Sequence, residues 1–176
     1  MPEYTLATPT PDMAPALARV HIDAWRETYS GRFDERHFSE EAYTGRLRMW
    51  ERILGGDPGP SGRPPRVAVA ASDDEPVGFA LAGPSRDEDL ADTDELFALY
   101  VLARLHGSGA GQALLDAVLG PGPGEAPEPE VDRQPASLWV LQDNPRAEAF
   151  YAKNGFVYDG HSRTEDGHTE VRMISG

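Results

Sequence analysis

Hydrophobic residues along the 176-residue chain recur with two spacings, one typical of helices and the other typical of strands. Residues 12–29 and 39–54 show the three- and four-residue spacing of amphipathic helices, whereas shorter apolar runs are bounded by turn residues. The elements predicted in chain order are a strand at 3–8, helices at 12–29 and 39–54, strands at 66–72, 76–83 and 94–102, a helix ending near Leu119, a strand at 137–142, a helix between Pro145 and Gly155, and strands at 156–160 and 169–175. This order predicts a mixed α/β sheet within one domain covering residues 1–176.

Each of the two N-terminal helices has a predicted capping residue and one apolar face. Asp12 is expected to cap the first helix and Ser39 the second, because short polar side chains accept a hydrogen bond from the first free N–H groups. The apolar faces are formed by residues three or four apart: Leu17, Val20, Ala24 and Trp25 in the first helix, and Tyr43, Leu47, Trp50 and Leu54 in the second.

Two further segments have a clear place in this arrangement. Residues 94–102 form a strand-like segment that is apolar on both faces, which predicts a central strand of the sheet. Residues 120–136 are rich in proline, glycine and acidic residues, so we expect an exposed, mobile loop there. This loop is not interpreted as a domain boundary, because the chain that follows it is too short to fold alone.

The composition argues against several classes of protein. The net charge of −14 argues against nucleic-acid binding, which needs basic surface to neutralise phosphates. Cysteine is absent, which excludes disulfides and thiol nucleophiles, and we expect a reducing, cytoplasmic location. The N-terminal residues lack the pattern of a signal peptide, and no apolar run approaches the ~20 residues of a membrane helix. We therefore expect neither a nucleic-acid nor a membrane partner.

A turn rich in glycine joins a strand to a helix within residues 99–118, LYVLARLHGSGAGQALLDAV. The N–H groups at the start of a helix lack intrahelical acceptors and favour anions, and glycine allows a ligand to approach the backbone closely. A P-loop is excluded because Gly111 is followed by Gln112 and Ala113, and the spacing also fails the dinucleotide fingerprint. From the glycines alone, two interpretations stay open: a phosphate site with donors from Gly107 to Gln112, and a tight turn without a ligand.

The wider segment resembles the acetyl-CoA-binding motif of the GNAT superfamily of N-acetyltransferases. In that motif an apolar strand is followed by Arg/Gln-x-x-Gly-x-Gly/Ala and an amphipathic helix, and here it falls on His106, Gly107, Ser108, Gly109, Ala110 and Gly111. The chain departs from the family at His106, where Arg or Gln is usual. Histidine is less reliably charged at neutral pH, so the side-chain contact with phosphate is more in question than the backbone donors.

A second segment, residues 138–157, resembles the other signature of the same family. The pattern N-x-x-A-x-x-x-Y-x-x-x-G-F falls on Asn144, Ala147, Tyr151, Gly155 and Phe156. Ala147 and Tyr151 are four residues apart and share one face of the predicted helix, which Gly155 ends. Residues 21–38 also resemble the first two helices of many members, so the resemblance covers nearly the whole chain.

The resemblance implies both a fold and a reaction. The fold is a mixed, mostly antiparallel sheet of about six to seven strands with about four helices, splayed at an acetyl-CoA cleft. The reaction is transfer of an acetyl group from acetyl-CoA to a primary amine of a small molecule or peptide, by direct attack in a ternary complex. The implied cofactor-binding residues are Val101, Leu102, His106, Gly107, Ser108, Gly109, Ala110, Gly111, Gln112 and Asn144. A non-catalytic acyl-CoA sensor or scaffold of the same fold is the alternative, and family members are often homodimers.

The chemistry of acetyl transfer assigns roles to three groups. Tyr151 matches the general acid of the family, which protonates the leaving thiolate. Glu95 is the candidate general base, acting directly or through water, and the alternative is a solvated residue of an acidic strand edge. The backbone N–H near Leu102 is the expected donor to the thioester oxygen.

Substrate contacts are expected from the junction of the first two helices and from a loop at residues 160–168. Tyr29 and Phe33 flank the break at Gly31 and are expected to line the substrate site, whereas Trp25 is either part of that wall or part of the helix core.

Charged and metal-ligating residue types near the predicted site give no clear signal of their own. Asp92, Asp94 and Glu95 would suit a cationic substrate or are simply solvated at a strand edge. His161 and His168 are interpreted as loop residues, because they lack a convincing pattern of metal ligands. No metal site is therefore expected.

Overall fold

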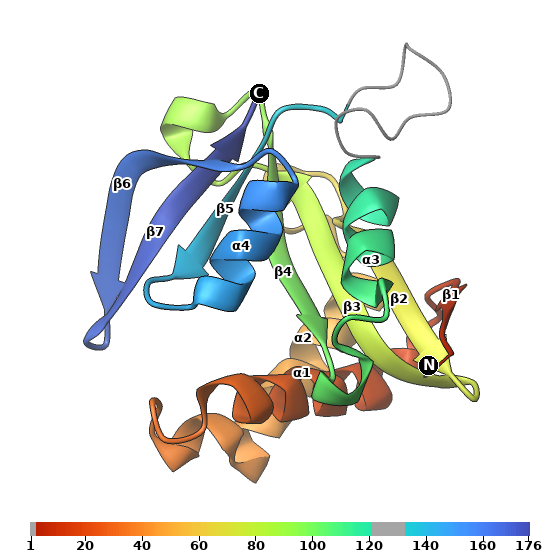
Figure 1. Ribbon diagram of the computed structural model, residues 1–176. Coiled ribbons are helices and arrows are strands. Elements are labelled where there is room, and N and C mark those ends of the chain that lie inside the picture. The colour runs from red at the N-terminus through yellow and green to blue at the C-terminus, as the bar shows by residue number, and fades with distance from the viewer. Residues whose placement is uncertain (1–2, 121–132) are drawn as a thin grey trace. The chain divides into compact units, whose positions relative to one another are not determined.

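The computed structural model of the chain describes residues 3–120 and 133–176 (Figure 1). These residues form seven strands: β1 (Thr5–Ala7), β2 (Arg66–Ser72), β3 (Glu75–Pro84), β4 (Asp94–Val101), β5 (Ala136–Leu141), β6 (Val157–Glu165) and β7 (His168–Ser175). They also form four α-helices: α1 (Ala14–Tyr29), α2 (Glu40–Leu54), α3 (Ala110–Leu119) and α4 (Pro145–Lys153). Every helix and strand predicted from the sequence is present, in the predicted order.

The strands form one mostly antiparallel sheet with the order β1-β2-β3-β4-β5-β7-β6. The prediction that residues 94–102 form a central strand is confirmed, because β4 is the fourth of the seven strands in this order. β4 and β5 pair in parallel, with Asp94–Leu96 opposite Ala136–Leu138. The described registers of β1 with β2, β5 with β7 and β6 with β7 are antiparallel. The expected fold class, a mixed sheet of six to seven strands with four helices, is therefore confirmed.

The chain divides into two compact units. The first contains the residues up to Leu81 together with Ala98–Val118, and the second contains Ala82–Phe97 and the residues from Leu119 onward. β3 and β4 each contribute residues to both units. That residues 1–176 form a single domain stays a prediction.

In the first unit, α1 and α2 lie on one face of β3 and α3 lies on the other. Adjacent strand residues point to opposite faces, and Gly78 and Phe79 illustrate this alternation. The Phe79 ring centroid lies 5.0 Å from that of His21 in α1 and 4.7 Å from that of Trp50 in α2. A Cβ built at Gly78 would lie 3.3 Å from a methyl carbon of Leu114 in α3. The missing side chain at Gly78 thus lets α3 lie close to the sheet.

The starts of α1 and α2 test the two predicted caps. Ser39 is confirmed, because its Oγ accepts a hydrogen bond from the N–H of Ala42 at 3.2 Å. The prediction for Asp12 is wrong, because Asp12 lies inside a 3₁₀ turn, Pro11–Met13, and α1 begins only after it. The fixed φ of Pro11 suits the first position of a helical turn, so the chain becomes helical before Asp12. On the predicted apolar faces the buried residues are Leu17, Val20, Ala24 and Trp50, and the half-buried ones are Trp25, Tyr43, Leu47 and Leu54.

The second unit contains a buried arginine surrounded by carboxylates. Arg172 of β7 is only 3% exposed, and it donates hydrogen bonds to Asp89 at 2.6 Å and to Asp159 at 2.7 Å. The hydrogen bond to Asp89 raises the pKa of Arg172, against the opposing effect of burial. Asp87 accepts from both Arg172 and the indole N–H of Trp139, at 3.3 and 3.0 Å. The charge of this buried guanidinium is therefore fully compensated.

The prediction that residues 160–168 form a loop is wrong. Residues up to Glu165 belong to β6, and β7 begins at His168, which pairs with Glu165 across the hairpin. The turn contains only Asp166 and Gly167, both with positive φ, as a two-residue hairpin turn requires. Polar residues occupy both faces of this hairpin end, so no alternation of apolar residues marked it as a strand.

Two expectations remain, one about the loop at residues 120–136 and one about membrane-spanning helices. Most of the predicted loop at residues 120–136 lies outside the described residues, which exclude 121–132. Within the described ranges, none of the helices has the length and apolar composition that crossing a membrane would require.

We expect Gly78→Ala to lower the free energy of unfolding by about 1–3 kcal/mol, because the new methyl group would overpack the interface between β3 and α3. Its Cβ would lie 2.9 Å from the carbonyl oxygen of Tyr100 and 3.2 Å from a methyl carbon of Val101. Gly45→Ala is the matched control, since Gly45 lies within α2 with no described atom inside 4 Å of its Cβ position. The control should gain about 0.5–1 kcal/mol from helix propensity. Urea unfolding of both variants measures the difference, and equal effects would contradict the packing argument.

Candidate functional site

The glycine turn between β4 and α3 has the geometry of a helix start. After β4 the chain forms a short 3₁₀ turn, Ala103–Leu105, and then passes through Gly107 and Gly109 with φ of 79° and 91°. The N–H of Ala113 donates to the carbonyl of Gly109 at 3.0 Å, which is the first hydrogen bond of α3. Positive φ favours glycine at both turn positions, so the glycine spacing in the sequence follows from the backbone path.

The backbone N–H groups at this helix start are the candidate anion donors. Helix geometry leaves the N–H groups of the first turn, Gly109 to Gln112, without an intrahelical acceptor. Ser108 Oγ accepts the N–H of Ala110 at 3.2 Å, so one predicted donor already has an acceptor within the turn. No described atom lies within 4 Å of a Cβ built at Gly107, which leaves open space beside the backbone. The turn therefore fits a diphosphate that approaches the backbone closely.

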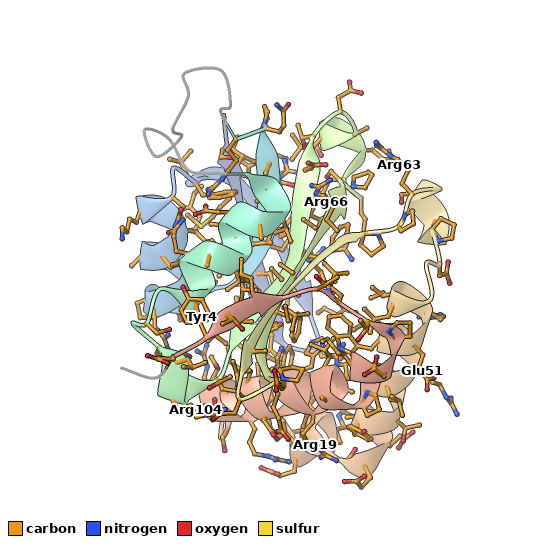
Figure 2. The ribbon with its side chains drawn as sticks, turned by 90° about the vertical axis from the view of Figure 1, so that its right-hand side faces the viewer. Tyr4, Arg19, Glu51, Arg63, Arg66 and Arg104 are labelled. Carbon is orange, nitrogen blue, oxygen red and sulfur yellow. The ribbon has the colours of Figure 1, made fainter. Side chains whose placement is uncertain are left out.

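Tyr4 is a neighbour of this turn that the sequence analysis missed. Its hydroxyl oxygen lies 3.5 Å from a Cβ built at Gly109, and Figure 2 shows Tyr4, the residue just before β1, near the start of α3. The residue lies more than a hundred positions from the motif, and only the packing of β1 against β2 brings it there. A local sequence pattern contains no signal for such a contact.

His106 makes a contact that differs from the predicted one with phosphate. Its Nε2 lies 2.9 Å from the carbonyl oxygen of Val101, and a carbonyl can only accept, so Nε2 carries the hydrogen. The side chain is exposed, and its hydrogen bond links the residue before the glycine turn to the end of β4.

The backbone beyond β4 is held by two hydrogen bonds within the first unit. The N–H of Leu102 donates to the carbonyl of Val77 in β3 at 3.0 Å, and the N–H of Ala103 donates to Glu27 of α1 at 2.7 Å. The predicted donor to a thioester oxygen, the Leu102 N–H, is thus already committed to β3 in this conformation. The carboxylate of Glu27, which the sequence analysis did not single out, fixes the path of the chain immediately before the glycine turn.

The three predicted substrate residues lie together in one aromatic cluster. Ring centroids of Trp25 and Tyr29 are 5.2 Å apart, those of Trp25 and Phe33 are 5.0 Å apart, and those of Tyr29 and Phe33 are 5.3 Å apart. His37 extends the cluster, with its ring 5.5 Å from that of Phe33. The indole N–H of Trp25 donates to the hydroxyl of Tyr100 in β4 at 2.7 Å. The helix junction and β4 therefore meet at these rings.

His21 lies behind this cluster in the interior of the first unit. Its ring centroid is 5.2 Å from that of Tyr100, and its Nδ1 is buried without a hydrogen-bond partner among the described residues. Burial, followed by the positive charge of Arg46, lowers the pKa of His21 to about 3. The imidazole is consequently neutral at physiological pH.

In the second unit, α4 and its N-cap contain the two residues of the downstream motif for which a role was predicted, Tyr151 and Asn144. Asn144 is the N-cap of α4, and its Oδ1 accepts the N–H of Ala147 at 3.3 Å. This capping role explains why the motif places Asn three residues before Ala. Tyr151 is 9% exposed, and its ring centroid lies 5.3 Å from that of Phe150 and 5.9 Å from that of Phe156. The neighbouring rings restrict the orientation of Tyr151.

Glu95 is a buried ion-pair partner, which contradicts the alternative of a solvated residue. It is 1% exposed, and Oε1 accepts from Nη2 of Arg86 at 2.5 Å. Oε2 accepts from the Nε and from the backbone N–H of Arg86, at 3.2 and 3.0 Å. Asp92 is exposed and Asp94 is half-buried, so these three residues do not form one acidic surface. Arg86 was missed because it lies in a loop nine residues earlier, with no periodic relation to the strand.

Within residues 3–120 and 133–176, no group of three or more histidine, aspartate or glutamate side chains is arranged to hold a metal ion. His161 lies in β6, where its Nδ1 is 3.0 Å from Nη2 of Arg172, and His168 begins β7. Both residues were expected in a loop, and both are strand residues.

The chain matches one protein family over most of its length. The model of the acetyltransferase (GNAT) family matches residues 19–156. Among curated proteins, an uncharacterized N-acetyltransferase of Bacillus subtilis, YuaI, is 35% identical over 101 residues, covering 56% of this chain and 53% of that protein. An uncharacterized N-acetyltransferase of Mycobacterium tuberculosis is 37% identical over 100 residues, covering 54% of this chain and 56% of its own length. The matches thus span about half the length of these relatives.

Solved structures show the same fold. The N-acetyltransferase PaiA of Thermoplasma acidophilum, crystallised in complex with coenzyme A, has a TM-score of 0.63 and 20% identity, over 97% of this chain and 98% of that one. An N-acetyltransferase of Staphylococcus aureus has a TM-score of 0.65 and 14% identity, over 97% of this chain and 99% of that one. At these identities the likeness concerns the fold alone.

We expect His21 to make stability depend on pH between about 6.5 and 3. The folded pKa lies below the unfolded value, so only the unfolded chain takes up the proton in this window, and stability falls as pH falls below 6.5. His21→Phe keeps an aromatic ring beside Phe79 and Tyr100 but removes the titration. Between pH 7.5 and 5.5, the wild type should lose about 1.4 kcal/mol more than the variant in urea unfolding. The same loss in both proteins would show that His21 is protonated in the folded state.

Proposed function

The chain belongs to the acetyltransferase (GNAT) family, and we propose that it transfers an acetyl group from acetyl-CoA to a primary amine of a small molecule or peptide. The observation that supports this proposal best is the helix start at Gly107–Gln112. Its outward N–H groups and the open space at Gly107 suit the diphosphate of a coenzyme. The coenzyme A complex of PaiA, a protein of the same fold, agrees with this choice of ligand.

The proposed binding residues divide between backbone and side-chain donors. Backbone N–H groups of the segment from Gly107 to Gln112 would bind the diphosphate, with Ser108 shaping the turn through its bond to Ala110. Backbone groups of Val101 and Leu102 would pair with the pantetheine like a strand, and the amide of Asn144 would also contact the pantetheine. A ligand would have to compete for the Leu102 N–H with the carbonyl of Val77. We therefore do not assign that N–H to the thioester oxygen.

Acetyl transfer needs a neutral amine and a protonated leaving group. An alkylamine with a pKa near ~10.4 is deprotonated in only about one molecule in a thousand at pH 7. Tyr151 is the proposed acid for the leaving thiolate, because a phenol hydroxyl can donate a proton to a thiolate. The packing of its ring against Phe150 and Phe156 supports a fixed orientation of the hydroxyl.

Glu95 is the proposed base, and it would have to act while it is paired with Arg86. It would have to accept a proton, directly or through water, while Arg86 holds both carboxylate oxygens. The competing interpretation is that Glu95 only anchors the loop that carries Arg86. The pH dependence of the reaction separates the two interpretations.

A non-catalytic acyl-CoA-binding module of the same fold is the second candidate function. The commitment of the Leu102 N–H to β3 and the pairing of Glu95 with Arg86 are the observations that favour it. The lack of cysteine fits a cytoplasmic location for either function.

We expect the protein to release coenzyme A from acetyl-CoA when a suitable primary amine is present. Because the chain contains no cysteine, a thiol reagent reports only the released coenzyme. Calorimetry with acetyl-CoA should detect binding in the same preparation. Tight binding without amine-dependent thiol release over a broad amine panel would support the sensor module and reject the enzyme.

Tyr151→Phe should lower kcat by about 100-fold or more and leave the affinity for acetyl-CoA nearly unchanged, as expected for loss of a general acid. Tyr158→Phe is the control, because Tyr158 is a half-exposed tyrosine of β6 outside the proposed site. The control should keep the wild-type kcat. An equal loss of kcat and acetyl-CoA affinity in Tyr151→Phe would make Tyr151 a binding or core residue.

Glu95→Gln should remove the acidic limb of the pH profile of kcat/KM if Glu95 is the base. A carboxylate that only pairs with Arg86 would instead leave the shape of the profile intact. Urea unfolding measures the loss of stability that accompanies the substitution. Both quantities should be measured on the same preparation, because the loss of an ion-pair partner of a buried group destabilises the fold in either case.

A further inference from the structure

Arg46 of α2 is a half-buried cation that has no polar partner in the part of the chain that the structure describes. Its guanidinium carbon lies 5.9 Å from the ring centroid of Trp25, and no hydrogen bond or ion pair joins it to any residue within 3–120 or 133–176. Burial lowers the pKa of Arg46, although the hydroxyl of Tyr100 acts in the opposite direction. Removing a charge from water without an opposite charge is costly, so such an arrangement calls for an explanation.

Other arginines of the chain show how such charges are normally compensated. Arg26, on α1, donates to Asp23 and to the carbonyl of Phe38. Arg86 is paired with Glu95, and the buried Arg172 contacts several aspartates. Arg46 lies on the same face of α2 as Leu47 and Trp50, where an apolar residue would be expected. The chain therefore keeps a cation at a position where stability alone favours a hydrophobic residue.

Arg46 borders an aromatic cluster that contains several polar groups. Trp25 lies beside the guanidinium and donates its indole N–H to Tyr100 at 2.7 Å. The ring of Tyr100 packs against His21, whose Nδ1 is buried and also lacks a partner among the described residues. Two buried or half-buried polar groups without partners thus belong to one small cluster of α1, α2 and β4.

We propose that Arg46 binds the carboxylate of the acetyl acceptor, so that the enzyme acts on small amines that also carry a carboxylate, such as free amino acids. This inference rests on the proposed acetyl transfer and specifies its acceptor. The planar guanidinium presents two parallel N–H groups that match the two oxygens of a carboxylate. Trp25, Tyr29 and Phe33 would contact the apolar part of the same molecule.

The charges favour a monoanion over the other acceptor classes. One unpaired cation balances one carboxylate, whereas the two charges of a phosphate monoester would need a second cation. A purely cationic amine such as a polyamine would meet the positive charge of Arg46 beside Trp25. A long peptide carries its carboxylate far from the reacting N-terminal amine, which would leave Arg46 unpaired.

The test compares each amino acid with its own α-amide in the thiol-release assay. The twenty amino acids and the matching amino-acid amides differ in the carboxylate but share the side chain. Converting the carboxylate to an amide also lowers the pKa of the amine, which by itself changes kcat/KM. For each variant, kcat/KM for the acid is therefore divided by kcat/KM for the amide, and this ratio is compared with the wild-type ratio. We expect wild type to use at least one free amino acid, with Arg46→Gln lowering that ratio by about 10- to 100-fold.

Two further variants serve as controls for this ratio. Arg48→Gln removes the same charge from the exposed side of α2 and should leave the ratio unchanged. Arg46→Lys keeps the charge but loses the bidentate geometry, and it should fall between wild type and Arg46→Gln. A ratio that Arg46→Gln does not change, or that Arg48→Gln changes equally, would overturn the proposal.

Stability measurements test the same residue without turnover. If Arg46 is kept for ligand binding, Arg46→Met should match or exceed wild type in its urea midpoint, because it removes a half-buried charge without an opposite charge beside it among the described residues. A lower midpoint would assign Arg46 a structural role and reject the inference. If no amine is acetylated although acetyl-CoA binds, the proposed function fails. Calorimetry with the free amino acids and Arg46→Gln then still decides whether Arg46 binds carboxylates.

Discussion

The backbone at the start of α3 imposes the constraint on which the proposed chemistry depends. A helix cannot satisfy the N–H groups of its own first turn, and here several hydrogen bonds fix the path of the backbone that leads into it. Glu27 holds the N–H of Ala103, His106 returns to the carbonyl of Val101, and Ser108 accepts from Ala110. The turn is therefore preorganised by its own neighbours, and a bound anion would not have to order it.

The sequence predicted those features that depend on local periodicity and turn chemistry. The order of elements, the central position of β4, the Ser39 cap and the glycine turn all depend on residues within a few positions of one another. Asp12 was misassigned because Pro11 begins a helical turn one residue earlier. The β6–β7 hairpin extends through residues that are polar on both faces, where apolar alternation gives no signal.

The site itself was less predictable, because its decisive contacts join distant parts of the chain. Tyr4 reaches the turn at Gly109 through strand pairing, and Trp25 finds its acceptor, Tyr100, seventy-five residues away. The pairing of Glu95 with Arg86 depends on the path of a loop. Arg46 did offer a signal, since a cation interrupts the apolar face of α2. Only the structure shows that no carboxylate within residues 3–120 and 133–176 compensates it. Resemblance to the family motifs identified the family. The inference about the acetyl acceptor depends instead on whether the charge of Arg46 has a partner.

The position of Trp139 has a practical consequence for spectroscopy. The chain has three tryptophans, and Trp25 and Trp50 both belong to the first unit, which leaves Trp139 as the single indole of the second. Its ring lies under the guanidinium of Arg163, 4.3 Å from the centroid, and its N–H is bonded to Asp87. A version of the protein with phenylalanine at the other two positions would carry one fluorophore. Its emission would follow the second unit alone as denaturant is added.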